Sequence, residues 1–141
     1  MNYTRITLAA LGAFAVNMVI GYLVFALLTS MRREYQKYPA VYRSSEGMKS
    51  VMPFAMVSMF VARFVLAVIY AMLYRGGSGL AEGAQFGALI GVFVISAFVI
   101  HNYVNLNIGL KLTLQQSVAY FIEWLAIGIV IGLIYKPVVA R

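Results

Sequence analysis

Four apolar segments of the sequence are each long enough to cross a lipid bilayer, and they cover residues 6–28, 51–74, 84–103 and 114–135. A membrane-spanning helix needs roughly 20 predominantly apolar residues, because the hydrocarbon core is about 30 Å thick. Within that core every backbone amide must be hydrogen-bonded inside the protein, and a helix meets this condition by itself. The sequence therefore predicts an all-α integral membrane protein, a four-helix bundle in which neighbouring spans are antiparallel.

The composition indicates one membrane domain over residues 1–141. Of these residues 63% are hydrophobic and 11% are charged, and 11 Lys and Arg stand against 4 Asp and Glu. The basic residues mostly flank the apolar segments, where they contact anionic headgroups, so we expect the lipid bilayer and no nucleic acid as a partner. The chain contains no cysteine, which excludes disulfides, dithiol redox chemistry and thiolate metal sites.

Local signals predict where the spans begin and end. The first apolar segment is too long for the core of a cleaved signal peptide, so we interpret it as an uncleaved span. Residues 29–50 are predicted to be a basic connector in the headgroup layer. The GGSG sequence at 76–79 predicts a tight hairpin between the second and third spans. Pro53 is expected in the first turn of the second span, and Thr113 with Gln116 matches a capping box at the start of the fourth.

Two ionisable residues lie at the centres of apolar segments, Arg63 in the second and Glu123 in the fourth. A charge at the bilayer centre costs roughly 3 kcal/mol on insertion scales, so such residues normally face the bundle interior and find a partner. Because the second and fourth of four spans point the same way, the two charges share one depth. We therefore predict that they form an ion pair. Asn17 at the centre of the first span and Ser96 just beyond the centre of the third are predicted to complete a midplane polar cluster.

A polar strip is predicted between this cluster and the end of the bundle that carries the basic connector. Gln116, Tyr120 and Glu123 follow one another at spacings of four and three, which places them on one helix face. His101 and Asn102 lie at the same end of the bundle and are predicted to join the strip, along which protons or water could reach the carboxylate. His101 is the only histidine, so we predict no multi-histidine metal site.

Glycines at helical spacing predict close packing between helices. Gly83, Gly87 and Gly91 are four residues apart around the third span, and Gly128 and Gly132 repeat the spacing in the fourth. Small residues in such a row let membrane helices approach backbone to backbone. From Gly83 onward these glycines, together with the polar HNYVNLNIGLKL turn, resemble small four-span bacterial membrane proteins of unknown function. The resemblance implies no assigned activity, and we expect the protein in the bacterial inner membrane.

The distribution of basic residues predicts that the connector faces the cytoplasm, because cytoplasmic loops are enriched in Lys and Arg. The connector side carries six basic residues, which are Arg32, Arg33, Lys37, Arg43, Lys49 and Lys111. The opposite side carries four, which are Arg5, Arg75, Lys136 and Arg141.

Three classes of function remain open. The sequence contains no recognisable nucleophile, metal constellation or nucleotide motif, so a structural or assembly subunit of a homo-oligomer or larger membrane complex is favoured over an enzyme. A small transporter or channel that uses Asn17, Arg63 and Glu123 for proton- or ion-coupled transport is the second class. The third is an enzyme or module that binds lipid, quinone or another lipid-soluble small molecule. The sequence identifies no cofactor and no catalytic residue.

Overall fold

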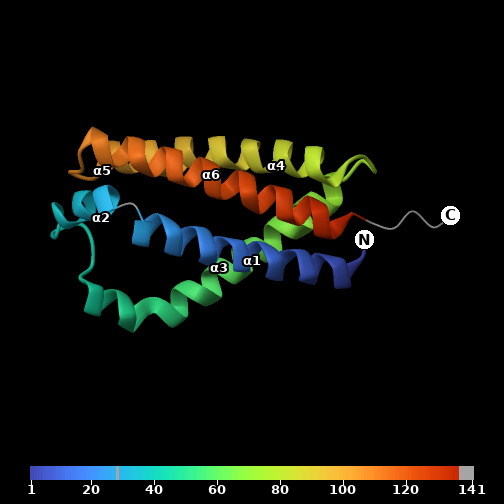
Figure 1. Cartoon of the computed structure of the whole chain (residues 1–141), viewed down its shortest axis with the longest axis horizontal. Coiled ribbons are helices and arrows are strands. Elements are labelled where there is room, and N and C mark those ends of the chain that lie inside the picture. Colours follow the sequence, from blue (N-terminus) through green and yellow to red (C-terminus); the bar gives the residue numbers. More distant parts are fainter. Residues whose placement is uncertain (28, 137–141) are drawn as a thin grey trace.

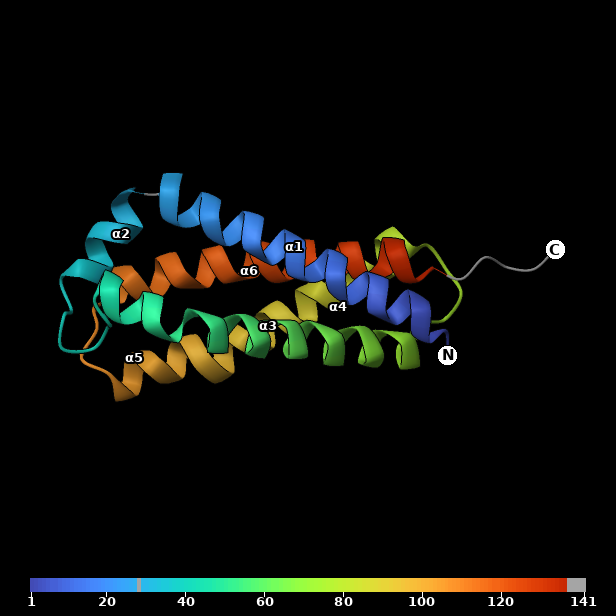
Figure 2. The ribbon, with the colours of Figure 1, turned by 90° about the horizontal axis from the view of Figure 1, so that it is seen from below.

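The computed structural model describes residues 1–27 and 29–136, and in this part of the chain every regular element is a helix. The helices, in chain order, are α1 (Tyr3–Leu27), α2 (Thr29–Gln36), α3 (Ser45–Leu73), α4 (Gly79–Val94), the π-helical turn η1 (Ile95–Ile100), α5 (His101–Asn105) and α6 (Leu110–Tyr135). The N-terminus and the end of α6 lie at one end of the molecule, and α2 and α5 lie at the other (Figures 1 and 2).

Four helical stretches are long and apolar enough to cross a membrane, and they cover Tyr3–Val24, Ser45–Leu73, Gly79–Asn105 and Leu110–Tyr135. The prediction of an all-α protein with four spans of membrane length is therefore confirmed. The chain has the length and composition of an integral membrane protein. The third stretch is continuous because α4, η1 and α5 follow one another without an intervening loop.

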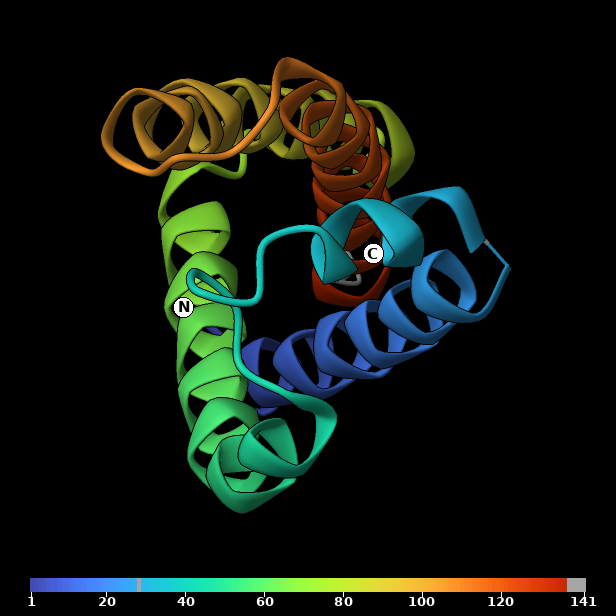
Figure 3. The same cartoon turned by 90° about the vertical axis from the view of Figure 1, so that its left-hand side faces the viewer.

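Packing in the bundle is centred on α6 and α1. The most extensive helix contacts are those of α4 with α6, followed by α1 with α6 and α1 with α3. Seen from the α2 end, the helices α3, α4, α6 and α1 lie around the bundle in that order (Figure 3). The predicted short turn is present at residues 74–78, but α3 and α4 do not pack closely along their length. These two helices meet where the rings of Tyr70 and Phe86 lie 5.4 Å apart.

The glycines of α4 explain why this helix packs on α6 instead. Gly79, Gly83, Gly87 and Gly91 are the buried residues of α4. A Cβ atom added at Gly83 would lie 2.5 Å from the carbonyl oxygen of Gly128, and one added at Gly87 would lie 2.5 Å from that of Trp124. Side chains larger than hydrogen do not fit between these backbones, so the row of glycines selects the partner helix.

The second long helix begins earlier than the predicted residue 51. Ser44 caps α3, because its hydroxyl oxygen accepts a hydrogen bond from the backbone N–H of Gly47 at 3.1 Å. Pro53 consequently lies inside α3 and not in its first turn. The serine pair at 44 and 45 is a start signal that the apolar pattern alone did not reveal.

The last helix also begins earlier than predicted, at Leu110 and not at 114. Thr113 lies inside α6, where its hydroxyl donates to the carbonyl oxygen of Gly109 at 3.2 Å. The predicted capping box is therefore wrong. A threonine can bond the preceding turn from within a helix, so the sequence pattern does not by itself locate a helix start.

The basic connector is folded, since it contains α2 and the first turn of α3. Met31 and Glu34 are the buried residues of α2. Glu34 forms ion pairs of 2.8 Å with both Lys37 and Lys111, and only 6% of its side chain is exposed. These contacts hold α2 against the beginning of α6. The hydrogen bond from Lys111, and to a smaller extent the one from Lys37, holds the pKa of the Glu34 carboxyl below its usual value.

The apolar core lies in the half of the bundle that contains the N-terminus and the end of α6. Its buried members come from α1, α3 and α6, and they are Ile6, Ala9, Ala10, Ala13, Ala67, Tyr70, Ile127, Ile131 and Tyr135. Small residues on α1 let the neighbouring helices approach closely. The core thus closes one half of the bundle, and the polar side chains gather in the other half.

Candidate functional site

The midplane polar cluster consists of Asn17 on α1, Arg63 on α3 and Glu123 on α6. Asn17 and Arg63 are each only 5% exposed. Each residue lies within a different membrane-length helix, so the cluster joins three spans. The structure brings these three predicted residues together.

Asn17 links the two charged residues. Arg63 Nη2 donates a hydrogen bond to Asn17 Oδ1 at 2.5 Å, and Asn17 Nδ2 donates one to Glu123 Oε1 at 2.5 Å. Arg63 Nη2 and Glu123 Oε1 are 3.4 Å apart. The amide therefore uses its acceptor for the cation and its donor for the anion. One positive and one negative charge make the cluster neutral, which lowers the cost of burying it.

Trp124 is a fourth member of the site, and sequence reasoning missed it. The guanidinium carbon of Arg63 lies 4.3 Å from the centroid of the Trp124 ring. A cation over an aromatic face is attracted by the ring quadrupole, and the attraction is stronger where water is excluded. Trp124 lies within α6, four residues before Gly128. Its position directly after Glu123, at the depth of Arg63, is the sequence feature that could have indicated a contact with Arg63.

Parts of the cluster keep unused hydrogen-bonding capacity. Among the described residues, Arg63 Nε and Trp124 Nε1 are buried without a hydrogen-bond partner. The two hydrogen bonds accepted by Glu123 both end on Oε1, and its side chain is 13% exposed. Chemically, the site can hold a neutral ion pair and can present one carboxylate oxygen to a proton or a cation.

Ser96 does not belong to the cluster. It is exposed within the π-helical turn η1. The buried residue of η1 is Val99, and Ser96 lies on an exposed part of the same turn. The prediction that this hydroxyl supports the buried charges is therefore wrong.

The polar strip is present on α6 but continues into the connector. Gln116 is 6% exposed, and its Nε2 atom donates to the hydroxyls of Tyr35 at 2.8 Å and Tyr42 at 3.4 Å. The rings of Tyr35 and Tyr42 lie edge to face with centroids 4.7 Å apart. Tyr120 is half-buried one turn farther along α6, between Gln116 and Glu123. Burial raises the pKa of Tyr35 to about 12, so its hydroxyl stays protonated at neutral pH.

His101 and Asn102 do not contribute to this strip. Both are exposed on α5, which lies at a different corner of the bundle from α2 (Figure 3). Tyr35 and Tyr42 take the place that the sequence interpretation gave to His101 and Asn102. Both tyrosines belong to the connector, which was predicted to lie in the headgroup layer. Their inward packing follows from the anchoring of α2 on α6 by Glu34, which the connector's composition did not reveal.

The described residues contain no group of three or more His, Cys, Asp or Glu side chains that could hold a metal ion. The glycines predicted to pack the helices, Gly83, Gly87, Gly91, Gly128 and Gly132, all lie at the contact of α4 with α6.

Residues 8–132 match a protein family described as "Protein of unknown function (DUF1761)". The chain belongs to the DUF1761 family. The match covers nearly all of α1 as well as the glycine-rich helices, so the relationship extends well beyond the C-terminal part on which the resemblance rested. No curated protein and no solved structure matches the chain. The DUF1761 description assigns no activity, so any function must be argued from the site.

Proposed function

We propose that this membrane protein is a structural subunit of a membrane assembly, and that its midplane polar cluster holds α1, α3 and α6 in fixed register. Neighbouring helices in a membrane gain little from the hydrophobic effect, because lipid is as apolar as their side chains. Hydrogen bonds between buried polar groups then contribute a large part of the specificity of packing. The cluster supplies such bonds between all three helices.

The observation that carries this proposal is that buried apolar side chains fill the half of the bundle between the cluster and the N-terminus. Polar side chains lead from α2 through Gln116 towards Glu123. On the far side of Glu123 the core side chains are 0% to 5% exposed, among them Ile127 and Ile131 of α6 and Ile6 of α1. Conduction requires a polar path across the whole membrane. The packing of this half favours mechanical support.

The outer surface offers room for partners. In the most apolar window of each span, between 17% and 28% of the residues are buried inside the chain. Most of each span therefore faces lipid or another protein. A subunit role uses this surface, since the described residues outside the four membrane-length helices form only α2 and short connections.

Extraction of the tagged chain from its native membrane at its natural expression level tests the proposal. Native mass spectrometry in lipid-preserving polymer discs should give an assembly of one defined stoichiometry, with a mass above the 15.6 kDa of the single chain. Arg63→Met should reduce the fraction assembled, because it loosens α3. A monomer as the only species across a range of lipid compositions would contradict the subunit role.

Proton or cation exchange at Glu123 is a second candidate. The observation that favours it is the second carboxylate oxygen, which accepts neither of the described hydrogen bonds in a side chain that is 13% exposed. Purified chain in liposomes that contain a pH-sensitive dye should then dissipate an imposed pH gradient, and Glu123→Gln should abolish the flux. A rate equal to that of protein-free liposomes would eliminate this candidate.

A further inference from the structure

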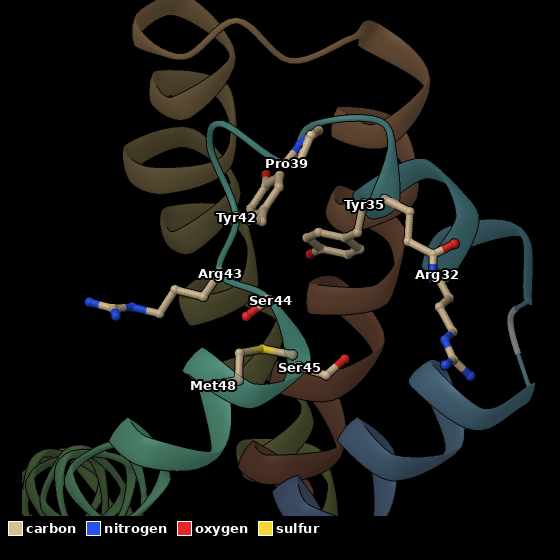
Figure 4. A pocket seen from close by; sticks show the side chains of 9 residues that line it. Arg32, Tyr35, Pro39, Tyr42, Arg43, Ser44, Ser45 and Met48 are labelled. Carbon is tan, nitrogen blue, oxygen red and sulfur yellow. The ribbon is translucent and has the colours of Figure 1, made fainter.

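A pocket opens between α2, the segment that follows it and the beginning of α3. Its volume is about 390 Å³, and its lining includes Tyr35, Tyr42 and Met48. Figure 4 shows the two tyrosine rings next to each other in the upper part of the pocket, with Met48 and Ser45 below them. Gln116 binds both tyrosine hydroxyls, so the tyrosines contribute mainly ring carbon to the pocket.

Two arginines flank the mouth of this pocket. Arg32 of α2 and Arg43 of the segment before α3 both line it and are both exposed. Figure 4 shows them on opposite sides with their guanidinium groups directed outwards. Within residues 1–27 and 29–136, the ion pairs use Lys37, Lys111 and Arg63, and neither pocket arginine belongs to one. The mouth therefore carries two cations whose charge is not neutralised by the described carboxylates.

The pocket lies at the end of the membrane-length helices, where lipid headgroups are expected. The first span ends at Val24 and the second begins at Ser45, and most of the lining residues lie between these points. Arg32 and Arg43 would meet phosphate groups there, because arginine binds phosphate through paired N–H donors. The tyrosine rings and Met48 below the arginines would contact the apolar part of a lipid and not water.

We propose that this pocket binds one anionic phospholipid, with the start of its apolar body against Tyr42 and Met48 and its phosphate at the mouth, where the exposed side chains of Arg32 and Arg43 turn towards it. A free phosphate ion would use the arginines but leave the larger, apolar part of the 390 Å³ unfilled. A neutral lipid would fill the volume but leave the two cations uncompensated. Only a ligand that is anionic at one end and apolar at the other matches both halves. This lipid site is independent of the proposed subunit role.

Lipid titration of the purified full-length chain tests the site. Native mass spectrometry in neutral detergent should show one phosphatidylglycerol bound at least about tenfold more tightly than phosphatidylcholine, because only the anionic lipid compensates both arginines. Arg32→Gln combined with Arg43→Gln should weaken phosphatidylglycerol binding by a similar factor. Arg33→Gln is the matched control, since Arg33 is an exposed neighbour on α2 that does not line the pocket. It should leave the affinity within about twofold.

A second variant tests the apolar half without changing charge. Met48→Trp should fill the pocket and reduce phosphatidylglycerol binding, while the melting temperature stays that of the unmodified protein because Met48 is 44% exposed. Inorganic phosphate at millimolar concentration should not displace the lipid. Equal losses in the Arg33 control and the pocket variant, equal affinity for phosphatidylcholine, unchanged binding in Met48→Trp, or displacement by inorganic phosphate would each overturn the proposal.

Discussion

The guanidinium of Arg63 donates a hydrogen bond to the side-chain oxygen of Asn17 at 2.5 Å. The neutral amide is therefore closer to the buried cation than the carboxylate of Glu123, which lies 3.4 Å away. Asn17 then donates to Glu123 through its other end. A side chain with both a donor and an acceptor can link a cation to an anion, which no purely acceptor or donor group can do. Asn17 is therefore the residue through which α1 joins the ion pair of α3 and α6.

Asn17→Leu should destabilise the protein by about 2 kcal/mol, because it leaves polar groups on both Arg63 and Glu123 unpaired in a buried site. The measurement is the free energy of unfolding in mixed detergent and denaturant. Asn102→Leu makes the same substitution at an exposed asparagine. It should change the stability by less than about 0.5 kcal/mol. Similar losses in both variants would show that Asn17 has no special role.

Gly87→Ala should destabilise the bundle by about 1 to 3 kcal/mol, because overpacking a close contact forces backbones apart. The new Cβ would lie 2.5 Å from the carbonyl oxygen of Trp124 and 2.9 Å from that of Leu125. Gly21→Ala is the matched control on α1, where nothing lies within 4 Å of the added atom. Thermal unfolding should show a lower midpoint for the first variant and an equal or higher midpoint for the second. The opposite order would contradict the α4–α6 packing.

Acid should loosen the attachment of α2 to α6. The pKa of Glu34 is lowered in the folded protein by Lys111 and Lys37, from a usual value of 4.5. A depressed carboxyl pKa contributes stability above the usual value, and this contribution is lost as pH falls through the lowered pKa. Thermal unfolding midpoints measured from pH 7 down to pH 3 should therefore fall less in Glu34→Gln than in the unmodified protein. Glu46→Gln, at an exposed carboxylate in the first turn of α3, should retain the full acid effect. An unchanged pH profile in the Glu34 variant would refute the link.

The fold class was predictable because the bilayer permits few solutions. Long apolar runs must become helices there, so four such runs give four spans whatever their detailed packing. Helix starts were less predictable. The cap supplied by Ser44 depends on a local hydrogen bond that apolar periodicity does not register.

The candidate site was predictable in part, for a similar reason. Burying Arg63 and Glu123 in lipid is so costly that they must seek polar partners, and Asn17 offered an amide at the same depth. The positions of Ser96, His101 and Asn102 depended instead on which face of each helix turns inward. The packing of glycines decides that rotation for the α4 side of the bundle. The inward position of Tyr35 depended on an ion pair between Glu34 and Lys111, which are far apart in the sequence.

A double-mutant cycle on the central charges tests the structural role of the cluster most directly. Unfolding of the unmodified protein, Arg63→Met, Glu123→Leu and the combined variant is followed in one detergent through Trp124, the only tryptophan. Each single variant should lose about 3 kcal/mol or more, because one buried charge is left without its partner. The combined variant should assemble normally and should lose only about 2 kcal/mol, because two apolar side chains replace a neutral pair while the buried amide of Asn17 is left without its two hydrogen-bond partners. Losses that simply add in the combined variant would contradict the account, since they would show that Arg63 and Glu123 do not act as a pair.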